Sequence, residues 1–260
     1  YEIFAREAAP GGYTPYYDVD SPLYAFDWGT QVDGSSRNPD GAEGPRPTGN
    51  DFTGHAYNPF GITGKNVITY YFARQGEIFI DEDPTTPGTT DTIVASGFEQ
   101  WEKDAYLNAF GAYSKVADLV YVEVQDRTDA DFVLITYEGT PGPGVSLLGR
   151  MSPPDEENEG RTEFNAADER WNEEGLAPGG FSFNTLIHEL GHGHGMAHPH
   201  DNGGRSGIMH GVQSDGVAFS YTNGDFDLNQ SVYTMMSYED AWEKSPYGQA
   251  DTGDPYGWLG

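Results

Sequence analysis

Residues 188–198 read His-Glu-Leu-Gly-His-Gly-His-Gly-Met-Ala-His, and they fit the pattern H-E-x-x-H-x-x-G-x-x-H at every fixed position. With 7 His and 35 Gly among 260 residues, chance would place this string in about one in ten thousand such sequences or fewer. Histidines four residues apart lie on one face of a helix, so their imidazoles can point at one place. The string therefore predicts a helix that carries a metal site.

The three histidines of the pattern are the candidate ligands of this metal. His188 and His192 supply two nitrogens from the helix. Gly195 lets the chain leave the helix through a left-handed turn, and His198 then supplies the third nitrogen. Three imidazoles suit zinc, and three protein ligands leave one coordination position for water. The spacing thus predicts one catalytic zinc ion.

Glu189 follows the first ligand on the same helix. At this position it can hydrogen-bond a water on the metal without being a ligand itself. Zinc lowers the pKa of such a water from about 15.7 towards 7, so Glu189 can accept its proton near neutral pH. We therefore predict that Glu189 is the general base of a hydrolytic reaction.

Two other interpretations of the string remain open. A buried helix could carry histidines that only pack, but this would need three histidines at ligand spacing by accident. A site could also bind zinc without performing chemistry. Degenerate hydrolases most often lose the glutamate, and Glu189 is present here.

The extended histidine motif resembles the signature of the metzincin metallopeptidases. A second stretch, residues 233–238 (Tyr-Thr-Met-Met-Ser-Tyr), is similar to the Met-turn of that superfamily. The resemblance implies that Met236 is the turn methionine beneath the metal, with Met235 as the alternative register. It also implies that Tyr238 donates a hydrogen bond to the oxyanion of the scissile carbonyl and is a candidate further zinc ligand.

Within the metzincins, the chain resembles the serralysins, which are secreted bacterial proteases. Pro199 follows the third histidine as in that branch, and the chain has no cysteine, unlike the disulfide-stabilised branches. The resemblance covers roughly residues 64 to 258 and implies a secreted zinc metalloendopeptidase that acts on protein or peptide substrates. Two alternatives remain: another metzincin branch, and a noncatalytic zinc- or calcium-binding module derived from such a protease.

The chain departs from the serralysin pattern at both ends. The glycine-rich, calcium-binding repeats that normally follow the catalytic domain are absent, and the chain stops at Gly260, where we expect a further helix. We therefore expect a truncated, processed or shorter variant. Residues 1–63 exceed what we expect before the first strand, and they predict an irregular N-terminal extension.

The resemblance implies an α/β (α+β) domain of two lobes. We expect a twisted, mostly parallel sheet with two long helices as the upper lobe, up to about residue 196 of a catalytic domain spanning residues 64–260. An irregular lower lobe would follow from about residue 197 to 260, with the substrate cleft between the lobes.

The pattern of apolar residues predicts the individual elements of this domain. Residues recurring from Ile93 to Phe110 favour an amphipathic helix, and Phe181 to Gly195 form the helix of the metal site, with Ser182 or Asn184 as N-cap. A strand at Gly144 to Met151 is the candidate edge strand for extended substrate. Other strands are expected at residues 69–74, 120–124, 132–137 and 162–165.

The charge excludes one class of partner. The chain has 42 acidic and 13 basic residues, a net charge of −29, so it lacks the clustered cations that nucleic acid requires. No apolar stretch reaches the roughly 18 residues of a membrane span. No export signal is present, so secretion follows only from the resemblance. The acidity fits solubility, a saline habitat or bound calcium. We expect a monomer.

Other polar residues are weaker candidates. His55, His194, His200 and His210 lie outside the ligand pattern, and we expect ordinary roles at the surface or behind the ligands. Asp225, Asp227 and Asn229 alternate as in a calcium loop, but the required glycine and closing glutamate are missing. These three are therefore expected to be solvated turn residues. Calcium itself remains open.

Overall fold

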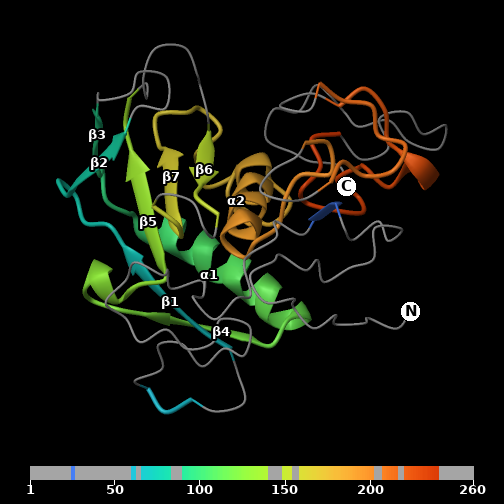
Figure 1. Cartoon of the computed structure of the whole chain (residues 1–260). Helices are drawn as coiled ribbons and strands as arrows, with labels where there is room; N and C mark the ends of the chain where they lie inside the picture. Colours follow the sequence, from blue (N-terminus) through green and yellow to red (C-terminus); the bar gives the residue numbers. More distant parts are fainter. Residues whose placement is uncertain are drawn as a thin grey trace.

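The fold was analysed in a computed structural model of the chain (Figure 1). It describes residues 25–26, 60–62, 66–82, 90–139, 148–153, 158–201, 207–215 and 220–239. In these residues the chain forms one five-stranded sheet, a two-stranded hairpin and two α-helices.

The main sheet has the strand order β4-β1-β5-β7-β6. Its strands are β1 (Asn66–Phe72), β4 (Leu119–Glu123), β5 (Phe132–Tyr137), β6 (Gly149–Met151) and β7 (Arg161–Asn165). All neighbours run parallel except β6, which pairs antiparallel with β7 at the edge of the sheet. The prediction of a mostly parallel α/β sheet is therefore confirmed.

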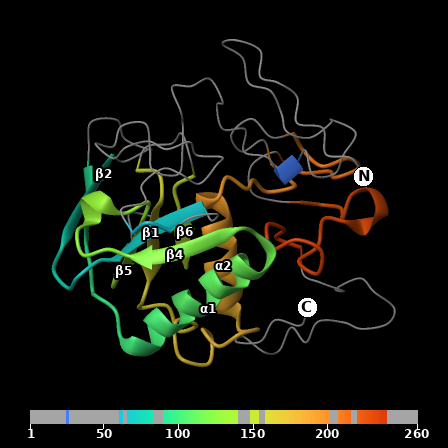
Figure 2. The same ribbon diagram turned by 90° about the horizontal axis from the view of Figure 1, so that it is seen from below.

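Both helices pack on the same face of this sheet (Figure 2). They are α1 (Gln100–Val116) and α2 (Phe181–Gly193). Along β5, Phe132 and Leu134 point to the core under the helices, whereas Ile135 and Tyr137 belong to a second core under the hairpin. This alternation is why β5 reads as an apolar strand buried on both faces.

The first predicted helix was placed too early in the chain. Ile93 and Val94 lie in strand β3 (Thr90–Val94), which pairs antiparallel with β2 (Ile78–Glu82). The helix begins only after Gly97, which has a left-handed backbone, and Glu99 caps it in a reciprocal box with Glu102. Apolar spacing alone could not separate strand from helix here, because the β-branched residues of β3 fit both periods.

The start of α2 also differs from the prediction. Its N-cap is Gly180, and Ser182 and Asn184 lie inside the helix. The Ser182 hydroxyl donates instead to the carbonyl of Arg170. The Ser182 side chain, which local sequence predicts as a helix cap, thus makes a tertiary hydrogen bond instead.

The predicted edge strand is β6, although only its last three residues are described as strand. The rest of that prediction, residues 144–147, lies outside the described residues. After α2 the described chain contains one short 3₁₀ turn, η3 (Asp225–Asp227), and one isolated β-bridge, between Ser214 and Ser220. This matches the expectation of an irregular segment following the metal-site helix.

Candidate metal centre

Helix α2 presents the first two candidate ligands on one face. His188 and His192 are both 7% exposed, and their rings lie with centroids 4.9 Å apart. The helix ends at Gly193, two residues before the predicted end, and Gly195 then has the predicted left-handed backbone, with a φ of 84°. Met196 N then donates to the Gly191 carbonyl and Gly195 N to that of His192, a glycine-dependent C-terminal turn that reverses the chain.

This reversal brings His198 back to the helix. Its Nε2 lies 3.0 Å from Nε2 of His188 and 3.0 Å from Nε2 of His192. A tetrahedral zinc ion with Zn–N bonds of about 2.0–2.1 Å holds its nitrogens about 3.3 Å apart. The three Nε2 atoms therefore converge at close to the spacing that such an ion requires.

The other nitrogen of each ring is held by a hydrogen bond. Nδ1 of His188 contacts the Met235 carbonyl at 2.5 Å, and Nδ1 of His192 contacts the Met196 carbonyl at 2.8 Å. Nδ1 of His198 lies 2.6 Å from a carboxylate oxygen of Asp201. Each acceptor places the proton on Nδ1, so that the Nε2 lone pairs face one another.

The electrostatics of the cluster agree with this assignment. Burial, together with the neighbouring imidazoles, lowers the pKa of His192 to about 3 and holds the pKa of His188 well below its usual value. Both rings are therefore neutral near pH 7 and can donate lone pairs to a cation. The donor set, its orientation and its protonation all fit zinc.

Glu189 lies beside the ligands, 9% exposed. Burial raises the pKa of its carboxyl to about 8, and a hydrogen bond from the Met151 backbone opposes this shift. A dication held by the three imidazoles would lower the same pKa further. The carboxyl is therefore poised to exchange a proton near neutral pH.

The last described segment, residues 220–239, contacts helix α2 at the metal site through Met236. Met236 is 1% exposed, and a Cβ built on Gly191 would lie 2.7 Å from its sulfur. A side chain at position 191 would therefore require this methionine to move away from the helix. Met235, the alternative register, provides the carbonyl that binds His188 and also lines the adjacent cavity.

Tyr238 stands at the rim of the centre, 53% exposed. Its ring centroid lies 5.5 Å from that of His188 and 4.7 Å from that of His198. Partial burial and the carboxylates of Glu189 and Asp201 raise the pKa of its phenol. The hydroxyl thus keeps its proton and can act as a hydrogen-bond donor.

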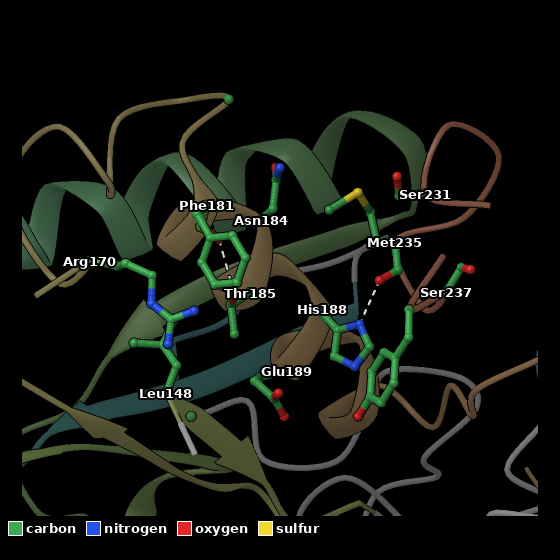
Figure 3. A pocket seen from close by; sticks show the side chains of 13 residues that line it. Leu148, Arg170, Phe181, Asn184, Thr185, His188, Glu189, Ser231, Met235 and Ser237 are labelled. Atoms are coloured by element: carbon green, nitrogen blue, oxygen red, sulfur yellow. Dashed lines mark hydrogen bonds between the residues drawn. The ribbon is translucent and has the colours of Figure 1, made fainter. Parts of the chain in front are cut away.

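A cavity of about 460 Å³ opens beside His188 and Glu189 (Figure 3). Its wall comes from the β6 edge, from the N-terminal half of α2, from the loop before that helix and from the last described segment. These residues are Leu148, Gly149, Arg170, Gly179, Phe181, Asn184, Thr185, His188, Glu189, Ser231, Met235, Ser237 and Tyr238. It is large enough for a side chain of a bound substrate.

The histidines outside the motif have different environments. His194 is partly buried and its Nε2 lies 2.7 Å from the hydroxyl of Tyr121. His200 is 0% exposed and stacks on His198 with ring centroids 5.0 Å apart. His210 is exposed, as expected for a surface residue, and His55 lies outside the described residues.

The sequence predicted that the alternating residues 225–229 are solvated turn residues, and this prediction was wrong at one position. Asp225 and Asp227 are exposed, but Asn229 is fully buried. Its side chain donates to the Ser220 hydroxyl at 2.7 Å and accepts from the Ser237 hydroxyl at 2.8 Å. Asn229 therefore ties two parts of the lower segment together.

Sequence reasoning missed Asp201 and Arg170. Asp201 lies three residues after His198, and a carboxylate at that distance from a ligand was a usable signal. Arg170 enters the cavity wall from a loop before α2, and no local pattern marks it. The two carbonyls that orient His188 and His192 could not be predicted, because every residue type has a backbone carbonyl.

The converging histidines, the glycine turn and the methionine beneath the helix define a metzincin-type metallopeptidase with a serralysin-like catalytic domain. The Matrixin peptidase family matches residues 62–234, more than half of the 260 residues, and the chain belongs to this family. Membership implies zinc as the metal, and a group formed by His188, His192 and His198 could bind it.

Two curated relatives are similar to this chain. A serralysin of Photorhabdus laumondii is 26% identical over 166 residues, which cover 62% of this chain and 30% of the relative. A serralysin of Photorhabdus luminescens is 27% identical over 148 residues, covering 55% and 27% respectively. The aligned part thus spans less than a third of either relative. In the described part of the chain, neither helix has the length and apolarity needed to cross a membrane.

Proposed function

We propose that this protein is a zinc-dependent endopeptidase that hydrolyses peptide bonds in proteins, and that residues 64–260 form its catalytic domain. The observation that carries the proposal is the convergence of three Nε2 atoms beside the buried carboxyl of Glu189, at one end of a cavity. A structural zinc site would be closed by a fourth protein ligand, whereas this one has a base and a cavity at the open position.

The chain's own residues supply the acid–base chemistry. When bound, zinc contributes Lewis acidity and lowers the pKa of a coordinated water towards about 7. Glu189 accepts the proton of the attacking water and then passes it to the leaving amine. Its burial keeps the carboxyl away from bulk water, so the proton stays within the site.

Substrate would bind along the edge strand β6. This strand has a partner on one side only, β7, among the described strands. An extended peptide can add to such an edge through main-chain hydrogen bonds, which give affinity with little side-chain selectivity. Leu148 and Gly149 belong both to this edge and to the cavity wall, so a bound peptide would lie with one side chain at the cavity.

Replacing Tyr238 with Phe should lower kcat by about a hundredfold, the usual effect of losing one oxyanion donor. The phenol ring lies beside both His188 and His198, and the change removes only its oxygen. Steady-state kinetics and zinc content should be measured together. An unchanged kcat would exclude the donor role, and a large loss of zinc would make Tyr238 chiefly a ligand.

Replacing Asp201 with Asn should weaken zinc binding by about 10- to 100-fold. The carboxylate holds the Nδ1 proton of His198, and an amide holds it less strongly and in more than one orientation. Competition with a chelator of known affinity measures the change. Asp168→Asn, which removes a carboxylate outside the histidine cluster, is the matched control and should leave zinc affinity unchanged.

The function is tested directly by incubating the zinc-loaded chain with casein, with and without a zinc chelator. We expect cleavage at internal bonds that stops on chelation and returns when zinc is restored. Stoichiometric zinc without cleavage of any polypeptide would instead support the noncatalytic module. The similarity to serralysins also supports secretion, and we propose a secreted monomer, to be checked by light scattering and by locating the protein in the producing culture.

A further inference from the structure

Arg170 brings a positive charge to the wall of the cavity. Its guanidinium carbon lies 4.5 Å from the centroid of the Phe181 ring. Nε and Nη2 each donate to one carboxylate oxygen of Asp168, both at 2.8 Å. The guanidinium is therefore fixed on one edge by a carboxylate and on one face by an aromatic ring, which leaves it little freedom to swing away.

The opposite edge of the guanidinium is available to a ligand. Arginine carries five N–H donors, and Asp168 takes two of those on the side chain. Among the described residues, Asp168 is the acceptor for this guanidinium. The remaining donors, on Nη1 and the outer side of Nη2, form a second fork that matches a carboxylate. Figure 3 shows the guanidinium directed towards Leu148 and Thr185, with His188 on the far side of the cavity.

The rest of the wall suits a side chain with an apolar stem. Leu148, Phe181 and Met235 are apolar, and Asn184 and Thr185 are polar without charge. Apart from Arg170, the ionisable residues of the wall are His188, Glu189 and Tyr238, which all belong to the metal centre. A glutamate side chain would pack its methylenes between the apolar groups and bring its carboxylate to Arg170.

We infer that the cavity selects substrates with an acidic residue next to the scissile bond, and that Arg170 is the residue that determines this specificity. The inference rests on the proposed peptidase function. A lysine would meet a like charge at Arg170, and a leucine would cover its donors without replacing their hydrogen bonds to water. Glutamine can accept only as a neutral group. The expected order of substrates is therefore Glu, Gln, Leu and then Lys.

The test uses internally quenched peptides that differ at the residue before or after the cleaved bond, with Glu, Gln, Leu or Lys in each position. A compensating charge at the far end keeps the net charge of all peptides equal, because the chain itself carries −29. At about 0.15 M salt the Debye length of about 8 Å screens the remaining field. For one of the two positions, kcat/KM with Glu should exceed that with Gln by about tenfold or more.

Arg170→Gln should lower the ratio of kcat/KM for Glu over Gln to about one. Arg170→Lys should retain only part of the preference, because lysine has the charge but not the forked pair of donors. Arg127→Gln is the matched control: Arg127 also lies over a phenylalanine ring, Phe79 at 5.1 Å, but outside the cavity. The ratio of kcat/KM for Glu over Gln in the Arg127→Gln variant should equal that of the parent. Thermal unfolding checks that the variants are folded, and the more conservative Lys variant carries the test if the Gln variant is not.

The same peptides should also be titrated into zinc-loaded Glu189→Gln by fluorescence anisotropy, where binding is read without cleavage. If the parent cleaves no peptide but this variant binds Glu over Gln, and Arg170→Gln removes that preference, the peptidase proposal fails and only the selection of an acidic side chain by the cavity stands. If peptides are cleaved but Leu or Lys is preferred, or the ratio survives Arg170→Gln, the specificity proposal is overturned alone. Absence of both cleavage and selective binding overturns both.

Discussion

Replacing Glu189 with Gln should lower kcat by at least about 10²- to 10⁴-fold, the range that general acid–base catalysis contributes. The amide has nearly the same shape as the carboxylate, but it cannot accept a proton from water or return one to the leaving amine. The three Nε2 atoms and their Nδ1 partners are untouched by the change. Zinc should therefore remain bound at one ion per chain while peptide cleavage disappears.

The measurement combines turnover of casein with zinc content and thermal unfolding. Glu189 is buried, and a buried carboxyl costs free energy that a neutral amide does not, so unfolding should not occur at a lower temperature. Glu169→Gln removes the same charge at an exposed position outside the cavity and should cleave like the parent. Comparable turnover by the Glu189 variant would show that another group is the base.

Removal of zinc should destabilise the part of the chain that follows α2 much more than the sheet. The ion would join His188 and His192 on the helix to His198 beyond the turn, and His188 in turn binds the carbonyl of Met235. The five-stranded sheet has its own core against α1 and α2. With free zinc at about a thousand times its Kd, binding adds about 4 kcal/mol to stability. For a domain of this size the loss corresponds to a fall in Tm of about 10 °C.

Hydrogen exchange of the zinc-loaded and chelated protein locates the effect. Protection should fall at residues 194–201 and 229–239, and amides of β1, β5 and β7 should change little. Restoring zinc should reverse the change, and magnesium, which prefers oxygen ligands, should not. Equal loss of protection in the sheet, or an unchanged Tm, would contradict a linking role of the metal.

Several elements could be predicted because their signals are local. Phe132 to Tyr137 is a buried strand between turn residues, and it is β5 with the same bounds. The helix of the metal site was placed within two residues of its end, because Gly195 stops it through its own backbone. Where local signals conflict, the prediction was wrong: Ile93 joins a strand because β2, a separate segment, is there to pair with it.

The metal site likewise has some features that local sequence predicts and others that depend on long-range packing. Helix periodicity and one glycine turn were enough to predict that four side chains converge on one site, because all four lie within one short stretch of chain. These residues are His188, Glu189, His192 and His198. The spacing was therefore enough to predict zinc and a base, and the resemblance of the motif to the metzincins implied a peptidase. Long-range packing decided the rest: the Met235 carbonyl that orients His188, the contact of Met236 with Gly191, which only the resemblance had led us to expect beneath the metal, and Arg170 in the cavity wall. Each depends on which distant segment reaches the helix, and no local periodicity encodes that.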